Sequence, residues 1–200
     1  MAKQSWKGSA LLGPVPPTLV TCGSMEQPNI FTVAWTGIIN TIPAKTYISV
    51  RPQRFSYPLI EASGQFVINL PTRSLVRAVD YCGVKSGRDV NKWEAMGLHT
   101  HPAFALEDCP LLAESPVSLE CRVTDKLELG SHHMFLADIV AVDVEESLLD
   151  KEGKLRLDRC GLLAYAHGDY YALGERLGSF GYSVRKKPAQ ESKKKKPKAK

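Results

Sequence analysis

The sequence lacks the short motifs that mark the common nucleotide and zinc sites. It has neither a G-x-G-x-x-G fingerprint nor a G-x-x-x-x-G-K-S/T phosphate loop. Its five cysteines form no C-x-x-C pair, and the closest two are twelve residues apart. These absences exclude a Rossmann dinucleotide site, a P-loop and a cysteine zinc site of the usual spacing. No metal is expected from His99 and His101 either, because no third ligand of matching spacing follows them.

Long hydrophobic runs are missing as well. No segment approaches the roughly 18 apolar residues that cross a membrane, and the N-terminal MAKQSWKGSALLGPVPP has no apolar h-region. An odd number of cysteines without a secretory signal predicts reduced thiols. We therefore expect a cytoplasmic protein with no membrane partner.

Positive charge is scarce in most of the chain, although the formal net charge is +5. Of the 26 Lys and Arg residues, nine lie from Arg185 onward beside one acidic residue, so residues 1–184 carry 17 basic and 20 acidic side chains. The 200 residues are 44% hydrophobic, which predicts one domain over residues 1–184. We expect residues 185–200 to be a disordered lysine-rich tail without a specific nucleic-acid partner, because no aromatic residues separate its lysines.

The chain does have many short apolar runs rich in β-branched and aromatic residues, bounded by Gly, Pro and Asn. These features predict strands over Thr18–Cys22, Ile30–Ile39, Thr46–Val50, Gln65–Leu70, Ser118–Leu127 and Met134–Asp143. Short helices are predicted over Tyr57–Gly64, over Ser74–Cys82 and around Trp93–Met96, with Ser56 and Asp89 as caps. The fold class is therefore mainly β with a few short flanking helices. On this pattern Trp35 lies in the core.

A turn between two predicted elements carries an unusual set of donors, Arg51-Pro52-Gln53-Arg54-Phe55-Ser56-Tyr57-Pro58. A guanidinium fork and a hydroxyl suit a phosphate, and the free N–H groups of a following helix favour an anion at the same place. The alternatives are two solvated arginines and a simple helix cap at Ser56. The order of the neighbouring motifs favours the phosphate.

Five motifs occur in a recognisable order over roughly residues 12–175: Asn29 with Thr32-Val33-Ala34-Trp35-Thr36, Ser49-Val50-Arg51-Pro52 with Ser56-Tyr57, Phe66–Pro71, Cys82-Gly83 with Ser86–Val90, and Lys92-Trp93 with Gly97-Leu98. In this order the sequence resembles the flavin reductase-like family, in particular its flavoredoxin-type members. The resemblance implies an antiparallel split β-barrel that forms a homodimer and binds FMN non-covalently at the subunit interface.

The same resemblance implies the site residues. FMN is expected to contact Asn29, Thr32, Val33, Ala34, Trp35, Thr36, Ser49, Val50, Arg51, Ser56, Tyr57, Asn69 and Lys92. Thr32 to Thr36 run along the isoalloxazine edge, and Arg51, Ser56 and Lys92 are directed to the phosphate. His167 is the catalytic candidate, placed over the flavin where nicotinamide would arrive.

Several of these residues have equally simple structural interpretations. Asn69 could be a satisfied core amide, Lys92 part of a solvated loop, and His167 a surface residue beside Asp169. Cys82 is expected to be a buried small residue. His132 and His133 are expected to be polar turn and strand-start residues.

Hydride transfer is the cofactor's chemistry, so it needs neither a Ser-His-Asp constellation nor paired carboxylates, and we find neither in a convincing arrangement. The first hypothesis is an FMN-dependent NAD(P)H:flavin oxidoreductase. The second is a flavoredoxin-like FMN electron carrier that takes electrons from a redox partner protein. A third is a pyridoxal phosphate or haem module on the same barrel, which the absorbance of the purified protein distinguishes.

Overall fold

The computed structural model of the protein describes residues 1–185. The predicted lysine-rich tail, apart from Arg185, lies outside these residues. Within residues 1–185, no helix is both long and apolar enough to span a membrane.

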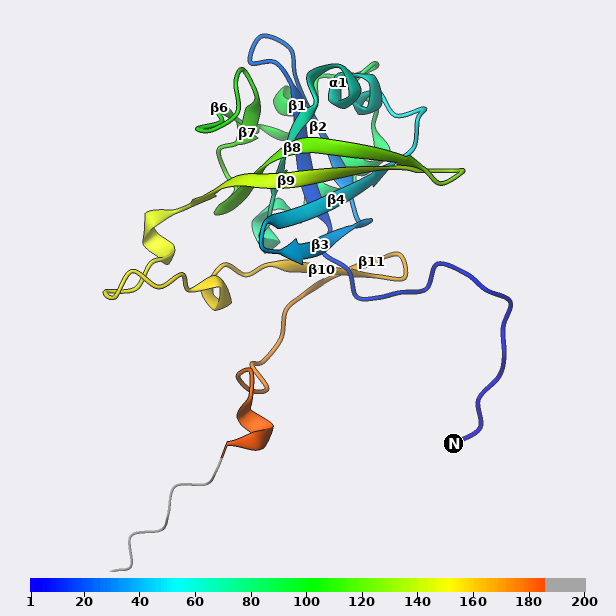
Figure 1. The fold of residues 1–200 in the computed structure, drawn as a ribbon, viewed down its shortest axis with the longest axis vertical. Coiled ribbons are helices and arrows are strands. Elements are labelled where there is room, and N and C mark those ends of the chain that lie inside the picture. The colour runs from blue at the N-terminus through cyan, green and yellow to red at the C-terminus, as the bar shows by residue number, and fades with distance from the viewer. Residues whose placement is uncertain (186–200) are drawn as a thin grey trace, which may run out of the picture.

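The centre of the described chain is a seven-stranded antiparallel sheet in the order β2-β1-β5-β8-β9-β4-β3 (Figure 1). Its strands are β1 (Thr18–Gly23), β2 (Pro28–Val33), β3 (Thr36–Thr41), β4 (Ala44–Val50), β5 (Gln65–Asn69), β8 (Val117–Glu128) and β9 (His133–Val144). Two smaller hairpins pair β6 (Thr100–Pro102) with β7 (Pro110–Leu112) and β10 (Leu163–Ala166) with β11 (Asp169–Ala172). The predicted mainly β, antiparallel fold is confirmed.

The chain passes from one edge of the large sheet to the other within two residues. β2 and β3 are the two edge strands, and only Ala34 and Trp35 separate them. The expectation of one buried strand over Ile30–Ile39 is therefore wrong, and β3 is largely exposed. Ser49 of β4 donates its backbone N–H to the Trp35 carbonyl at 2.9 Å, which fixes the crossing. The sheet is thus curled so that its edges approach each other, as in a split barrel.

Short helices cover the ends and one face of this barrel (Figure 1). They are α1 (Ser56–Ser63), η1 (Arg73–Leu75), α2 (Val76–Val84) and α3 (Lys92–Met96), with single 3-10 turns η2 (Glu146–Leu148), η3 (Leu157–Arg159) and η4 (Tyr182–Val184). The predicted end of α1 is confirmed, because Gly64 follows it in the left-handed conformation, with φ of 64°.

Two predicted helix caps are wrong. Ser56 lies inside the first turn of α1, where no side chain caps the helix, and its hydroxyl instead accepts a hydrogen bond from Asn29. At α3 the cap is Asn91, whose side chain accepts from the backbone N–H groups of Trp93 and Glu94. Asp89 lies two residues too early for that position.

The core contains four apolar clusters, and the two largest hold most of its buried side chains. The larger lies inside the barrel and includes Phe66, Phe135 and Ile60, all at most 1% exposed. The second joins β1 and β2 to α2 and α3, and it contains Trp93 and the predicted buried Cys82. Each fully buried large side chain stabilises the fold by about 1.5–3 kcal/mol. Trp35 is 37% exposed and belongs to neither cluster, so the prediction that it lies in the core is wrong.

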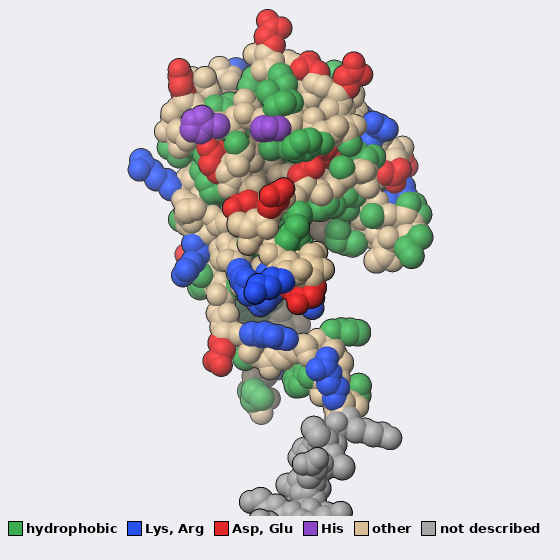
Figure 2. Space-filling model, turned by 90° about the vertical axis from the view of Figure 1, so that its left-hand side faces the viewer, with side chains coloured by type: hydrophobic (Ala, Val, Ile, Leu, Met, Phe, Trp, Pro, Cys, Tyr) green, Lys and Arg blue, Asp and Glu red, His purple; other side chains and the backbone are tan. Residues whose placement is uncertain are grey.

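The segments at both ends of the described chain extend from the barrel (Figure 1). Residues 13–15 still contact it, because Val15 forms an antiparallel bridge to Tyr165 of β10. In the face shown in Figure 2, acidic side chains lie mainly on the upper part and Lys and Arg mainly on the lower part. On this face the acidic and basic side chains are therefore largely separated.

Candidate functional site

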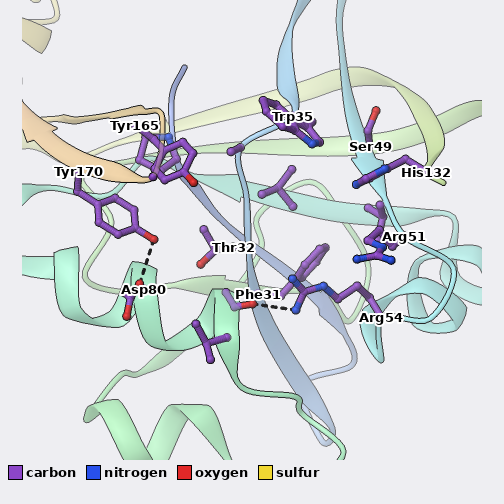
Figure 3. A pocket seen from close by; sticks show the side chains of 17 residues that line it. Phe31, Thr32, Trp35, Ser49, Arg51, Arg54, Asp80, His132, Tyr165 and Tyr170 are labelled. Atoms are coloured by element: carbon purple, nitrogen blue, oxygen red, sulfur yellow. Dashed lines mark hydrogen bonds between the residues drawn. The ribbon is translucent and has the colours of Figure 1, made fainter. Parts of the chain in front are cut away.

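A cavity of about 400 Å³ opens where the β2–β3 crossing meets the end of β4, helix α2 and the β10–β11 hairpin (Figure 3). The cavity forms at this point because the dipeptide Ala34-Trp35 leaves the sheet where the chain crosses from one edge strand to the other. The cavity is lined by Pro17, Phe31, Thr32, Val33, Ala34, Trp35, Ser49, Val50, Arg51, Arg54, Asp80, Gly83, Val84, His132, Tyr165, Gly168 and Tyr170. We call it the main cavity.

One end of the main cavity is aromatic and weakly acidic. Tyr170 donates its hydroxyl to Asp80 at 3.3 Å, and its ring lies 5.4 Å from the ring of Tyr165 (Figure 3). Burial, and then the charge of Asp80, raise the pKa of Tyr170 to about 12, so this phenol stays protonated and remains a donor at neutral pH. Two rings and a carboxylate offer both a flat apolar surface and an acceptor.

The opposite end is basic. Arg51 and Arg54 point into the cavity there beside His132 (Figure 3). Arg54 also donates through Nη1 to the carbonyl of Gly83 at 2.8 Å, which fixes its position between α1 and α2. Burial and the two guanidinium groups lower the pKa of His132, so the imidazole is neutral at neutral pH. This end therefore favours an anion.

A smaller cavity of about 250 Å³ adjoins this basic end and shares Phe31 and Arg54 with the main cavity. Four cationic side chains and one acidic side chain line it, together with two hydroxyl groups. Its lining comprises Phe31, Gln53, Arg54, Phe55, Ser56, Lys85, Ser86, Gly87, Arg88, Asp89 and Lys92. We call it the basic cavity, and its donors match the chemistry of a phosphate group.

Lys92 is the most unusual residue of the basic cavity. It is only 4% exposed, and none of the ion pairs found within residues 1–185 involves it. Burial lowers the pKa of its ammonium. The neighbouring thiols do not neutralise it, because burial raises the pKa of Cys22 to about 12 and that of Cys82 to about 11. A buried cation without a counter-charge is costly, so an anion in this cavity would stabilise it.

Close packing holds the wall of the basic cavity in place. The Asn29 side chain donates to the Ser56 hydroxyl at 2.7 Å, and Ser56 is 2% exposed. Gly87 lies against the same amide, so a Cβ at this position would meet Asn29 Oδ1 at 2.3 Å and Phe55 at 2.9 Å. The loop can approach this closely only because residue 87 has no side chain.

The structure brings most of the expected cofactor residues together. Two of them, Ser56 and Lys92, line the basic cavity, and seven line the main cavity: Thr32, Val33, Ala34, Trp35, Ser49, Val50 and Arg51. Asn29 supports Ser56 from behind and lines a separate cavity on the other side of Gly87. Lys92 is buried, so the alternative of a solvated lysine is wrong.

Besides Asn29, three expected residues line neither the main cavity nor the basic cavity. Asn69 is fully buried, and its amide is satisfied by Leu19, Thr21, Val67, Leu112 and Ser118, as the core interpretation requires. The Tyr57 hydroxyl lies 2.8 Å from Nδ1 of His133. Thr36 donates its hydroxyl to the Tyr47 carbonyl at 2.6 Å. Their side-chain polar groups have partners inside the protein.

His167 lies at the tip of the β10–β11 hairpin, where it has a positive φ of 54° and is followed by Gly168 with φ of 101°. Two consecutive positive φ values are typical of a type I′ hairpin turn. The side chain lines a cavity next to the main one. His132, which we expected to be a turn residue, lines the main cavity.

Several lining residues were not predicted as site residues, namely Arg54, Asp80, Lys85, Arg88, Tyr165 and Tyr170. Arg54 follows Arg51 by three residues and belongs to the same phosphate-like turn, so the sequence did carry that signal. Asp80 and Tyr170 meet across 90 positions of sequence, which no local pattern reveals.

Comparison with known proteins identifies the family of this chain. The model of one protein family, described as the flavin reductase like domain, matches residues 13–174. The chain belongs to the flavin reductase-like family. The structure of flavoredoxin from Desulfovibrio vulgaris (Miyazaki F) is 30% identical, covers 92% of this chain and 100% of that chain, and has a TM-score of 0.84. Flavoredoxin from Methanosarcina acetivorans is 25% identical with the same coverages and a TM-score of 0.83.

The fold is also that of a putative flavin reductase with a split barrel domain from Shewanella frigidimarina, which is 20% identical and has a TM-score of 0.75 over 85% of this chain and 87% of that chain. The expected split barrel is confirmed. As a member of the flavin reductase-like family with flavoredoxin relatives, the protein has a flavin-related redox function. A flavin fits the two joined cavities, since one offers flat aromatic walls and the other a cationic lining.

Proposed function

We propose that the protein binds FMN non-covalently, with the isoalloxazine ring in the main cavity and the phosphate in the basic cavity, and acts as an NAD(P)H-dependent flavin oxidoreductase. The observation that carries the FMN proposal is the buried Lys92 ammonium, which has no ion-pair partner within residues 1–185 and lines a cavity with three more cations. A phosphate dianion would supply the missing negative charge.

The residues of the two cavities would then contact different parts of FMN. Arg54, Ser56 and Lys92 hold the phosphate, and Phe31 lies at the junction of the cavities. Backbone groups from Thr32 to Trp35 satisfy the polar edge of the ring, which otherwise loses water on burial. When bound, FMN supplies hydride and single-electron chemistry, while the chain positions the ring and limits the access of water.

The electron donor separates two candidate functions. In the first, NADH or NADPH reduces the bound flavin directly. In the second, the protein is a flavoredoxin-like carrier that receives electrons from a redox partner protein, and this alternative is supported by the 30% identity to flavoredoxin over 92% of the chain.

Anaerobic stopped-flow mixing of the FMN-loaded protein with NADH and with NADPH tests the choice. We expect bleaching of the visible flavin absorbance with at least one nucleotide. No bleaching with either nucleotide, in a preparation that a chemical reductant does bleach, would leave only the carrier function. The same spectrum tests for pyridoxal phosphate or haem.

We also propose a homodimer in the cytoplasm. The proposal of a dimer is supported by exposed apolar side chains at and beside the edge strand β3, where Ile38 is 61% and Ile42 90% exposed. An unpaired apolar edge is unfavourable in water and favours association. Light scattering on the full chain tests it, and a monomer at tens of micromolar protein would contradict it.

A further inference from the structure

A cavity of about 640 Å³ lies beside the main cavity and has no part in the proposed binding of FMN. It lies between the N-terminal segment and the β10–β11 hairpin. Trp35, Tyr165 and Gly168 line both this outer cavity and the main cavity. A molecule in the outer cavity would therefore lie next to a ring in the main cavity.

The N-terminal segment forms one wall of the outer cavity because it is tied to β10. Val15 donates its N–H to the Tyr165 carbonyl at 2.9 Å, and Tyr165 donates back to the Val15 carbonyl at 2.8 Å. A Cβ at Gly13 would meet Ala166 at 3.8 Å, so the segment also packs closely on the hairpin. These contacts hold Leu11 and Leu12 beside the cavity that Trp35 and Tyr165 line.

The chemistry of the outer cavity differs from that of the basic cavity. Its lining contains no Lys, Arg, Asp or Glu, and it consists mainly of Trp6, Leu11, Leu12, Pro14, Trp35 and Tyr165. His167 supplies an imidazole that can donate or accept a hydrogen bond. The phosphates of a dinucleotide would find no cation here, whereas a flat uncharged ring would gain apolar burial and aromatic contacts.

We propose that the outer cavity binds an uncharged, flat aromatic or quinone-like molecule that accepts electrons from the flavin. This inference rests on the proposed function. A quinone bound there would take a hydride, which carries two electrons and one proton, from the singly protonated, anionic form of the reduced FMN ring and a second proton from solvent through His167. The products are the hydroquinone and oxidised FMN, so electrons and protons balance.

The test measures binding directly and does not depend on turnover. Duroquinone is titrated into the FMN-loaded protein while tryptophan fluorescence is followed, because Trp6 and Trp35 line the cavity. We expect saturable quenching. Leu12→Lys adds a charge at a position that is 84% exposed, so the fold should survive. It should weaken duroquinone binding at least tenfold.

Leu177→Lys is the matched control, since Leu177 is 89% exposed and lines none of the cavities described above. Its duroquinone affinity should equal that of the wild type, and both variants should keep the FMN affinity of the wild type. Equal quenching of the wild type and Leu12→Lys, or no quenching at all, would overturn the proposal. Loss of quenching as protein concentration rises would assign the outer cavity to a second copy of the chain and would also overturn it.

Failure of this proposal can be told apart from failure of the proposed function. The FMN affinity is measured separately, by quenching of flavin fluorescence. FMN binding without duroquinone binding would remove the outer site alone. If FMN itself does not bind, the proposed function fails, and duroquinone titration of the FMN-free protein still reports on the outer cavity.

Discussion

The side-chain amide of Asn29 donates to the hydroxyl of Ser56 at 2.7 Å, and this bond connects strand β2 to the first turn of α1. Ser56 faces the basic cavity, and the loop carrying Gly87 presses on the same Asn29 side chain. This buried hydrogen bond and the packing of Gly87 against it therefore connect three segments that surround the proposed phosphate site. Changes to any of them should affect the affinity for the phosphate.

Replacing Gly87 by alanine tests this packing. The new Cβ would lie 2.3 Å from Asn29 Oδ1, so either the loop or the amide must move. We expect Gly87→Ala to destabilise the fold by about 1–3 kcal/mol and to weaken FMN binding more than riboflavin binding. Urea unfolding and flavin titration measure the two effects. Gly8→Ala, with no neighbour within 4 Å of the added Cβ, is the control and should change neither.

Lys92→Met tests the ammonium of the basic cavity. A charged hydrogen bond to phosphate contributes about 1.5–3 kcal/mol, so FMN affinity should fall about 10- to 100-fold. Riboflavin lacks the phosphate, and its affinity should stay the same. Lys7→Met removes an exposed lysine and serves as the control. An equal loss of FMN and riboflavin affinity would show that Lys92 supports the fold and not the phosphate.

The sequence predicted the parts of the fold that depend on local pattern. The strands from Thr46 and from Gln65 are where apolar runs and turn residues placed them. The break at Ala34-Trp35 was missed, because both residues are apolar and only the meeting of the two sheet edges explains the crossing. Trp35 was assigned to the core because the same apolar run was interpreted as one buried strand.

The candidate site was predictable where its residues are close in sequence or carried by the family motifs. Seven expected residues from Thr32 to Arg51 do line the main cavity. The aromatic end was not predictable, because Tyr170 and Asp80 come from a hairpin and a helix that meet only in the folded chain. Asn69 looked like a site residue because a buried amide needs partners, and its partners are all in the core.

The affinity for FMN should depend on pH in both directions. Below about pH 6 the phosphate gains a proton and loses charge. At alkaline pH the Lys92 ammonium loses its proton, and because burial lowers its pKa, this decline should begin below the ordinary lysine value of about 10.4. Flavin titrations from pH 5 to pH 10 should show that the affinity for FMN falls at both the acid and the alkaline end. The affinity for riboflavin should fall at neither end. In Lys92→Met the alkaline loss of FMN affinity should disappear. The same alkaline loss in this variant as in the wild type would contradict its assignment to Lys92.

A buried carboxyl group, Glu120, and a partly buried one, Asp143, should make stability depend on pH. Glu120 is fully buried and accepts the backbone N–H groups of Phe104, Ala105 and Leu106, whereas Asp143 Oδ2 is buried without a partner. Burial, and then the charge of Glu120, raise the pKa of Asp143 to about 6. The folded state therefore holds a proton that the unfolded state releases near pH 4, and the free energy of unfolding falls as pH rises from about 4 to 6.

Asp143→Asn should remove this loss of stability at higher pH. The variant carries no charge beside Glu120, so it should be more stable than the wild type by about 1 kcal/mol at pH 8 and nearly equal at pH 4. Urea midpoints at the two pH values measure the difference. Asp125→Asn, at an exposed position on β8, is the control. A loss of stability at pH 8 in Asp143→Asn would show that the ionised carboxylate is favourable there.

The most direct test of the account is a parallel titration of the purified, flavin-free protein with FMN and with riboflavin. If the main cavity holds the ring and the basic cavity the phosphate, FMN binds at one molecule per chain and about 100-fold more tightly than riboflavin, which corresponds to roughly 2.7 kcal/mol for the phosphate. No saturable binding of FMN, or equal affinity for the two flavins, would contradict it.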